Sequence, residues 1–141
     1  MSREAVYAAL FAKLQAVPGI KTCSRKLVHW GDVPPEAQPA LYMTQKSETP
    51  RQQTGMPTIW VRSVDVYLYA RNNGLAAPAQ ALNDLLDSIE AALAPENAVA
   101  RTLTLGGLAH YVRIEGAIET DEGLLGDQAV AIVPVTIYLA Q

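Results

Sequence analysis

The sequence predicts an α+β fold, in which two amphipathic helices cover one face of a four- to five-stranded sheet of mixed or antiparallel strands. Apolar residues recur at helical spacing over residues 6–17 and 82–93. Long runs alternate apolar and polar residues over 58–70 and 127–139. The segments follow one another as helix, strands, helix, strands. Two helices can cover only one face of such a sheet, so its other face meets water, a folded-over strand or another subunit.

The length and composition fit one domain spanning residues 1–141. Half of the 141 residues are apolar, which is enough for a core. Charged residues make up 18%, below the roughly 25% of typical soluble domains, so part of the surface is less charged than usual. That fits burial in an oligomer, although a compact monomer with a neutral surface would have the same composition. The net charge of −3 argues against general nucleic-acid binding, which requires a basic face.

The sequence argues against secretion and against insertion into a membrane. The chain begins Met-Ser-Arg-Glu, without the basic and then apolar pattern of a secretory signal. No apolar run approaches the ~20 residues of a membrane helix. Cys23 is the only cysteine, which excludes an intrachain disulfide and a zinc site built from several thiolates. We therefore expect the protein to fold in a reducing cytoplasm.

The first expected element is a helix that starts after Ser2, a good N-cap residue. Its apolar stripe consists of Val6, Tyr7, Leu10, Phe11, Leu14 and Val17. Pro18-Gly19 ends the helix, and a short strand over 21–25 follows. The proline-rich residues 31–39 predict an ordered loop, because each proline disfavours helix in the residue before it.

Two strands and a loop are expected in the middle of the chain. The first strand spans 40–45, and the strongest strand pattern of the chain spans 58–70. In this second strand Val64, Val66 and Leu68 face one side, and Asp65, Tyr67 and Tyr69 face the other. Residues 46–57 between the strands are polar and contain two prolines and a glycine, so we expect a long, mobile loop there.

A second helix is expected after a turn at Asn73-Gly74. Pro78 suits its first position, where a missing N–H costs little. Its apolar stripe consists of Leu82, Leu85, Leu86, Ile89 and Leu93, and its solvated face of Asn83, Asp84, Asp87 and Glu90. Pro95 ends the helix. Leu103 and Leu105, which precede two glycines, predict a further short strand or a bend.

Two long strand patterns close the chain, at 108–119 and 127–139, with an acidic turn between them at 120–126. Strands that follow one another in this way can pair antiparallel, and so can the two central strands. Pro134 lies inside the last pattern and has no N–H to donate. We therefore expect this strand either at an edge of the sheet or bent by a bulge at Pro134.

No group of residues has the pattern of a catalytic, cofactor or metal site, and we expect no enzyme. His29 and His110 are far apart in sequence and lack partners at metal-ligand spacing. Cys23 lies in a short strand, where a small buried residue is expected. Asp121 and Glu122 lack the alternating oxygen ligands of a calcium loop, so we expect them at a solvated hairpin tip.

Other polar and aromatic residues on the strands favour surface contacts. Glu115 and Glu119 lie on one strand face and predict a cross-strand charge network. Trp60, Tyr67 and Tyr69 lie on or near one long strand with few charges nearby. Aromatic residues in such a setting suit a protein interface, and ordinary packing of a sheet face explains them equally well.

Five short motifs follow one another along nearly the whole chain. They are Val17-Pro-Gly-Ile20; Arg25…His29-Trp30 leading to Pro34-Pro35-Glu-x-x-Pro39-Ala40-Leu41-Tyr42; Val66-Tyr-Leu-Tyr-Ala70; Leu82-Asn-Asp-Leu-Leu-Asp-Ser-Ile89; and Gly126-x-x-Ala129…Val133-Pro-Val135-x-x-Tyr138. In this order they resemble the tail terminator proteins of long-tailed bacteriophages, the minor tail protein U-like or tail-completion family. Each motif describes an element of a fold, and none is a catalytic signature.

The resemblance implies a structural phage protein that closes into a hexameric ring. Such a ring caps the finished tail tube, ends its polymerisation and offers a surface for joining the head. The implied partners are further copies of the chain, the tail tube protein and the head-tail connector protein, and DNA passes through the lumen without specific binding. The resemblance implies no cofactor. It places the protein in the tail or neck of a virion or prophage particle that is assembled in the cytoplasm of the host bacterium.

The resemblance also suggests where contacts form. The long strands and Pro134 are expected near the contact between subunits, and the loop 46–57 is expected to order on the tail tube, with Arg51 pairing with an acidic partner. The interaction candidates are Arg51, Met56, Trp60, Tyr67, Tyr69, Glu122 and Pro134.

Other functions remain open at the level of sequence. Within the same class, the chain could be another ring-forming neck or head-completion protein. A small-ligand-binding α+β domain could use the open face of the sheet as its pocket. An enzyme could use Cys23 or a pair of histidine and glutamate residues.

Overall fold

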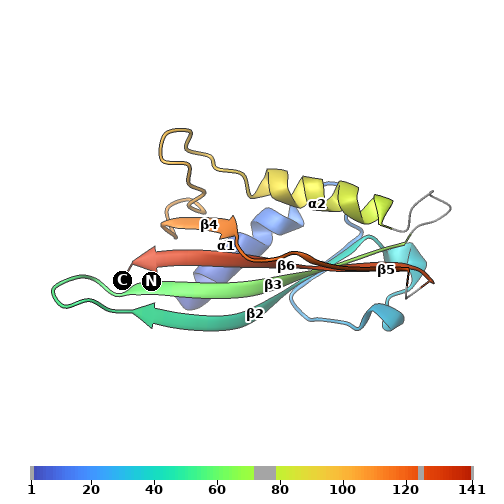
Figure 1. Ribbon diagram of the computed structural model, residues 1–141, viewed down its shortest axis with the longest axis horizontal. Coiled ribbons are helices and arrows are strands. Elements are labelled where there is room, and N and C mark those ends of the chain that lie inside the picture. The colour runs from blue at the N-terminus through green and yellow to red at the C-terminus, as the bar shows by residue number, and fades with distance from the viewer. Residues whose placement is uncertain (1, 72–78, 124–125, 141) are drawn as a thin grey trace.

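The computed structural model describes residues 2–71, 79–123 and 126–140, and within them it has the expected α+β architecture, with two helices packed on one face of a mixed sheet (Figure 1). The helices are α1 (Arg3–Gln15) and α2 (Gln80–Ala92). The strands are β1 (Thr22–Ser24), β2 (Ala40–Arg51), β3 (Ile59–Arg71), β4 (Tyr111–Ile114), β5 (Glu119–Gly123) and β6 (Gly126–Ala140).

The strand order is β1-β2-β3-β6-β4, and β5 pairs with β6 on the same side as β4. β1 and β2 are parallel, and every other pair is antiparallel. The predicted antiparallel pairs, β2 with β3 and the last strand with the one before it, are confirmed. The sheet has six strands rather than the expected four to five, because β4 forms within 108–119 and a separate strand, β5, forms over Glu119–Gly123, where a turn was predicted at 120–126.

Both helices form where the apolar spacing predicted them. The Ser2 hydroxyl caps α1 by accepting a hydrogen bond from the Ala5 N–H at 3.3 Å. The α2 stripe buries Leu82, Leu85 and Ile89. The predicted turn at Asn73-Gly74 and the first-turn position of Pro78 lie outside the described residues.

The main core lies between the helices and one face of the sheet. The β3 residues Val64, Val66 and Leu68 are fully buried on this face, as their alternation predicted. The inward positions of β6 are Ala129, Ala131, Val133, Val135, Ile137 and Leu139. The central strands are thus held by apolar contacts on the helix side, and their other face is free to carry polar groups.

The prediction of a loop over 46–57 is wrong for its first half. β2 continues through Arg51, which is paired with Ile59, and a register shift lies between Gln45 and Ser47. Polar residues and Pro50 are tolerated there because this part of β2 lies beyond the short β1 and has β3 as a partner on one side only. Residues 52–58 alone connect the strands.

The prediction that Pro134 lies at an edge or in a bulge is also wrong. Pro134 is paired with Asp65 of β3 in a continuous register, and β6 has strands on both sides. On the other side the neighbouring strand is interrupted between β4 and β5, where Gly116 has a φ of +109° and the Glu115 N–H donates to the Pro134 carbonyl at 3.1 Å. Since the N and O of one strand residue point to the same side, the missing N–H of Pro134 faces this gap.

The connection between β1 and β2 covers part of the opposite face of the sheet. It contains two 3₁₀ turns, at Trp30–Asp32 and Pro35–Ala37, within the predicted loop. Val33, Ala40, Tyr42 and Tyr69 form a second, smaller apolar cluster beneath it. Near residue 103 the alternative of a bend is confirmed, because residues 103–110 form no strand and the chain turns at 105–108.

Among the described residues, neither helix has the length and apolar character needed to cross a membrane.

Candidate functional site

The most prominent feature of the surface is a β-hairpin arm, which we define as residues 46–62. It comprises the end of β2, the loop 52–58 and the start of β3. Its loop projects past both helices, at the end of the molecule where the two termini lie (Figure 1). Met56 and Ile59 are 61% and 39% exposed, and Arg51 is also exposed. The arm thus presents apolar and cationic side chains away from the body of the molecule.

An ionic network holds the base of the arm to α1. Glu48 accepts hydrogen bonds from Arg3 Nε at 2.7 and 2.8 Å, and its Oε1 lies 2.9 Å from Nε of Arg62. The Arg62 side chain is 2% exposed and its guanidinium lies 5.6 Å from the Trp60 ring. Although Nε lies within ion-pair distance of Glu48, Arg62 Nε and Nη1 have no hydrogen-bond partner among the described residues. Glu48 is therefore the charge that compensates a buried cation.

At the opposite end of the β2–β3 ladder, which we call the pinned end, hydrogen bonds join residues 28–39 to β3 and β6. Gln38 and Gln128 exchange two side-chain hydrogen bonds, at 2.8 and 2.9 Å, and both residues are buried. The Tyr69 hydroxyl donates to the Val28 carbonyl at 2.7 Å. Burial, with a smaller contribution from the neighbouring Tyr42, raises the pKa of Tyr69 to about 12.

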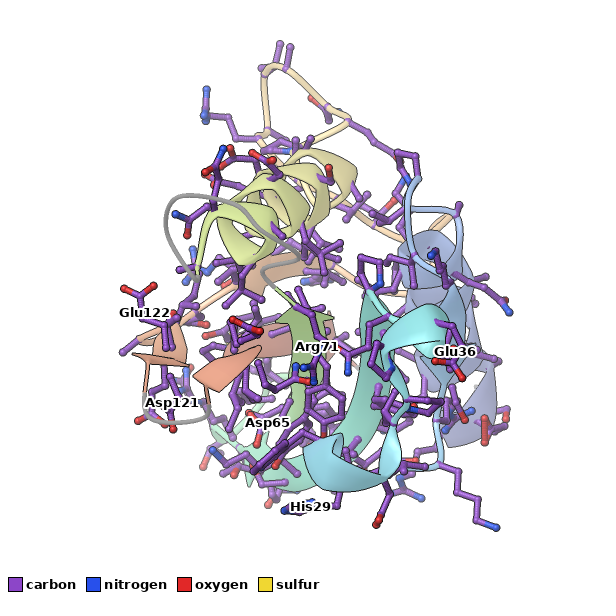
Figure 2. The ribbon with its side chains drawn as sticks, turned by 90° about the vertical axis from the view of Figure 1, so that its right-hand side faces the viewer. His29, Glu36, Asp65, Arg71, Asp121 and Glu122 are labelled. Carbon is purple, nitrogen blue, oxygen red and sulfur yellow. The ribbon has the colours of Figure 1, made fainter. Side chains whose placement is uncertain are left out.

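The uncovered part of the sheet face opposite the helices contains a shallow groove of about 390 Å³. Lys46, Asp65, Glu115 and Pro134 are among the residues that line it. Lys46 Nζ lies 3.8 Å from Asp65 Oδ2. Figure 2 places Asp65 on the side of the sheet away from α2. We call this feature the open-face groove; its lining mixes charges of both signs with small residues.

A cluster of aromatic and charged residues borders this groove. The rings of Tyr111 and Tyr138 stack at 4.4 Å between centroids, and the Arg113 guanidinium lies 5.0 and 5.5 Å from them. The Tyr138 hydroxyl donates to Glu115 at 2.6 Å, which lowers the pKa of Glu115 and raises that of Tyr138. The predicted charge network around Glu115 thus includes a tyrosine from β6. The alternation of β6 places Tyr138 on this face, and the pairing of 108–119 with 127–139 was predicted, but the register that sets Tyr138 opposite Tyr111 was not.

A second groove, of about 440 Å³, lies on the helix side. We call it the α2 groove, and define it by Leu86, Glu90, Leu93, Ile114 and Ile118. Its lining is mostly aliphatic, and Ile118 is 42% exposed. Sequence reasoning missed this groove, because Ile118 was placed in a continuous strand.

The structure does not bring the seven interaction candidates together. Arg51 and Met56 lie on the arm, and Trp60 lies at its base. Pro134 lines the open-face groove. Their proposed roles in binding a partner remain predictions.

The other three candidates are engaged within the chain itself. Tyr67 is half-buried and Tyr69 is buried under residues 28–39, so the alternative of ordinary sheet packing describes Tyr69. Glu122 accepts a hydrogen bond from the Ala79 N–H at 2.8 Å, directly before α2. Asp121 and Glu122 lie within β5 rather than at the predicted hairpin tip.

His29 and Cys23, residue types that often act in catalysis, have surroundings that favour a structural role. His29 Nδ1 accepts a hydrogen bond from the Gly31 N–H at 3.0 Å, and His29 lies far from Asp121 and Glu122 in Figure 2. Cys23 is half-buried rather than buried, and burial raises the pKa of its thiol, which disfavours the nucleophilic thiolate. Within the described parts of the chain, no three His, Cys, Asp or Glu residues are placed to hold a metal ion.

Comparison with known proteins identifies the fold. No family model matches the sequence, and no curated protein matches it. A solved structure whose name states no function has a TM-score of 0.56 and 18% identity, and the match covers 100% of this chain and 96% of that chain. A chain of the virion of a native gene transfer agent particle has a TM-score of 0.52 and 13% identity, over 96% of this chain and 92% of that chain. At these identities the matches establish a shared fold.

Proposed function

We propose that this chain is a structural component of a phage or phage-derived particle. The observation that carries the proposal is the fold shared with a chain of a gene transfer agent virion, over nearly the full length of both chains. The sequence motifs that resemble tail terminator proteins lead to the same class by a separate route. The surface supports a role in assembly, because the arm and the α2 groove expose aliphatic side chains.

Within this class we propose a tail terminator. Copies of the chain form a ring, with six as the number that the resemblance implies, and the ring caps the tail tube and presents a surface to the head connector. The proposed location is the tail or neck of the particle, after assembly in the bacterial cytoplasm. DNA passes through the lumen without specific contacts, which is compatible with the net charge of −3.

The test combines the mass in solution with binding to tail tubes. Light scattering coupled to size exclusion, from low micromolar to near-millimolar protein, is expected to show a monomer converting to a ring of about six subunits, which negative-stain images would resolve. Purified tail tubes from the matching particle are expected to carry the protein at one end and to stop growing. Tubes that elongate equally with and without the protein would contradict termination.

The open-face groove supports a second candidate, a small-ligand-binding domain. Its volume of about 390 Å³ is within the range of ligand pockets, and its lining includes Lys46, Asp65 and Glu115. Thermal denaturation against a library of charged metabolites distinguishes the two functions. A saturable rise in melting temperature that is lost in Lys46→Ala would favour the ligand-binding domain.

A further inference from the structure

We infer that the chain associates with a second copy of itself by placing the arm tip of one copy in the α2 groove of the next. The arm tip consists of Arg51, Met56 and Ile59. This contact rests on the proposed function, since a ring requires one contact that repeats between all neighbours.

The arm tip has the chemistry of a contact surface. Met56 and Ile59 are among the few large apolar residues that the described part of the chain exposes. Ile59 is paired with both Arg51 of β2 and Ala140 of β6, so the ladder holds both ends of the loop 52–58 in place. An apolar group held on a paired ladder loses less conformational freedom on binding than one on an unpaired tail.

The α2 groove has the complementary chemistry. Its lining is aliphatic apart from Glu90, and Ile118 at its border is 42% exposed. Glu90 and Arg51 carry opposite charges, and neither forms an ion pair with the described residues. Insertion of the arm tip would cover Met56, Ile59 and Ile118 and would allow Arg51 to approach Glu90.

The exposed edges of β2 and β5 are poorly suited to be the main contact between copies. The free edge of β2 carries Lys46 and Pro50 as well as the register shift after Gln45, all of which disfavour pairing with another strand. The outer edge of β5 carries Glu119 and Asp121, which oppose the approach of a strand by their charge and hydration. Side-chain surfaces are therefore the better candidates for association.

The contact uses two different surfaces of each copy. The arm extends from one end of the molecule (Figure 1). The α2 groove is lined by residues of α2, of β4 and of the connection from β4 to β5. Each copy in a chain of such contacts offers one arm and one groove. An arrangement of this type closes into a ring if the rotation between neighbours allows it.

The first experiment compares three variants by analytical ultracentrifugation. Met56→Ser with Ile59→Ser removes the apolar arm tip, and Ile118→Lys places a charge in the groove. Each is expected to raise the dissociation constant about tenfold or more, since each removes the burial of large apolar side chains. Val99→Ser is the matched control, because Val99 is 96% exposed and lies outside both surfaces, and it is expected to change the constant by less than about twofold. Unchanged circular dichroism and melting temperature would confirm that each variant folds.

Mixing provides the decisive experiment. The arm variant retains its groove, and the Ile118→Lys variant retains its arm. Neither is expected to assemble alone, whereas their mixture is expected to form one-to-one dimers and nothing larger. Charge reversal tests the pairing of Arg51 and Glu90: Arg51→Glu and Glu90→Arg are each expected to weaken assembly several-fold, and the double variant is expected to restore it.

Three results would overturn the contact. They are a wild-type protein that remains monomeric at near-millimolar concentration, variants that assemble as well as the wild type, and a mixture that yields no dimer. Wild-type rings with unaffected variants would reject the contact and leave the proposed function in place. The tail-tube assay tests the proposed function separately, because it needs no knowledge of which surfaces meet.

Discussion

The two ends of the β2–β3 ladder differ in how their polar and apolar groups are satisfied. At the pinned end, the amides of Gln38 and Gln128 bond to each other and Tyr69 bonds to a backbone carbonyl, all beneath a covering loop. At the arm, the apolar side chains of Met56 and Ile59 face solvent. Charge pairs, formed by Glu48 with Arg3 and Arg62, lie at the base of the arm. We therefore propose that the pinned end contributes mainly to stability and the arm mainly to association. Both ends are built on the same pair of strands, so matched substitutions can test the division.

The first comparison replaces a glutamine by leucine at each end, and the replacement at the pinned end should have the largest effect on stability. Gln128→Leu removes the side-chain hydrogen bonds to Gln38 and to the Ala70 carbonyl, and it leaves the buried Gln38 Oε1 without its donor, while Gln38 Nε2 keeps its bond to the Val33 carbonyl. The loss should cost about 3 kcal/mol. The melting temperature should fall by roughly 10 °C. Gln52→Leu removes an exposed hydrogen bond to Thr58 in the arm and should change stability by less than about 0.5 kcal/mol. Urea denaturation measures both changes. Equal losses in the free energy of unfolding would contradict the assignment of stability to the pinned end.

The base of the arm should give an intermediate effect. Glu48→Gln leaves the buried Arg62 cation without its compensating charge and should cost about 2 kcal/mol, less than for a fully buried pair because Glu48 is 21% exposed. Replacing both residues, as Glu48→Leu with Arg62→Met, should recover much of the loss, since no buried charge remains. Chemical denaturation of the single and double variants measures the coupling. A double variant that is less stable than Glu48→Gln would show that the ion pair itself stabilises the fold.

Tyr69→Phe should cost about 1 kcal/mol at neutral pH, because the Val28 carbonyl loses its donor. The folded-state pKa of Tyr69, about 12, lies above the ordinary tyrosine value of 10.0. The wild type therefore has the full contribution of the neutral hydroxyl below pH 10 and loses it as the pH rises through 12. The stability difference between wild type and Tyr69→Phe should shrink over that interval in alkaline urea titrations. A constant difference from pH 9 to 12 would contradict the assigned burial of the hydroxyl.

The smallest effect on stability is expected at the tip of the arm. Met56→Ser changes a side chain that is 61% exposed and should alter the free energy of unfolding by less than about 0.5 kcal/mol. Its effect on self-association should be much larger. If Met56→Ser lowered the free energy of unfolding but assembled like the wild type, the assignment of association to the arm would be wrong.

Several elements of the fold could be predicted because their signals are local. Ser2 followed by the stripe containing Val6 and Leu10 specifies α1, and the alternation around Val64 and Val66 specifies β3 and its buried face. The interaction candidates Tyr67 and Tyr69 share one face of this strand pattern, yet Tyr67 is half-buried and Tyr69 is buried. Alternation separates the two faces of a strand, but it does not say what covers each face.

The sequence by itself determined the helices, the alternating faces of the central strands and the α+β class, because each follows from apolar periodicity within a short segment. The tertiary structure decided what depends on distant partners. Polar residues 46–51 extend β2 only because β3 pairs with them. Pro134 lies within the sheet because the neighbouring strand breaks opposite its missing N–H. The α2 groove exists because that break turns Ile118 toward α2, a consequence of pairing that no local pattern encodes.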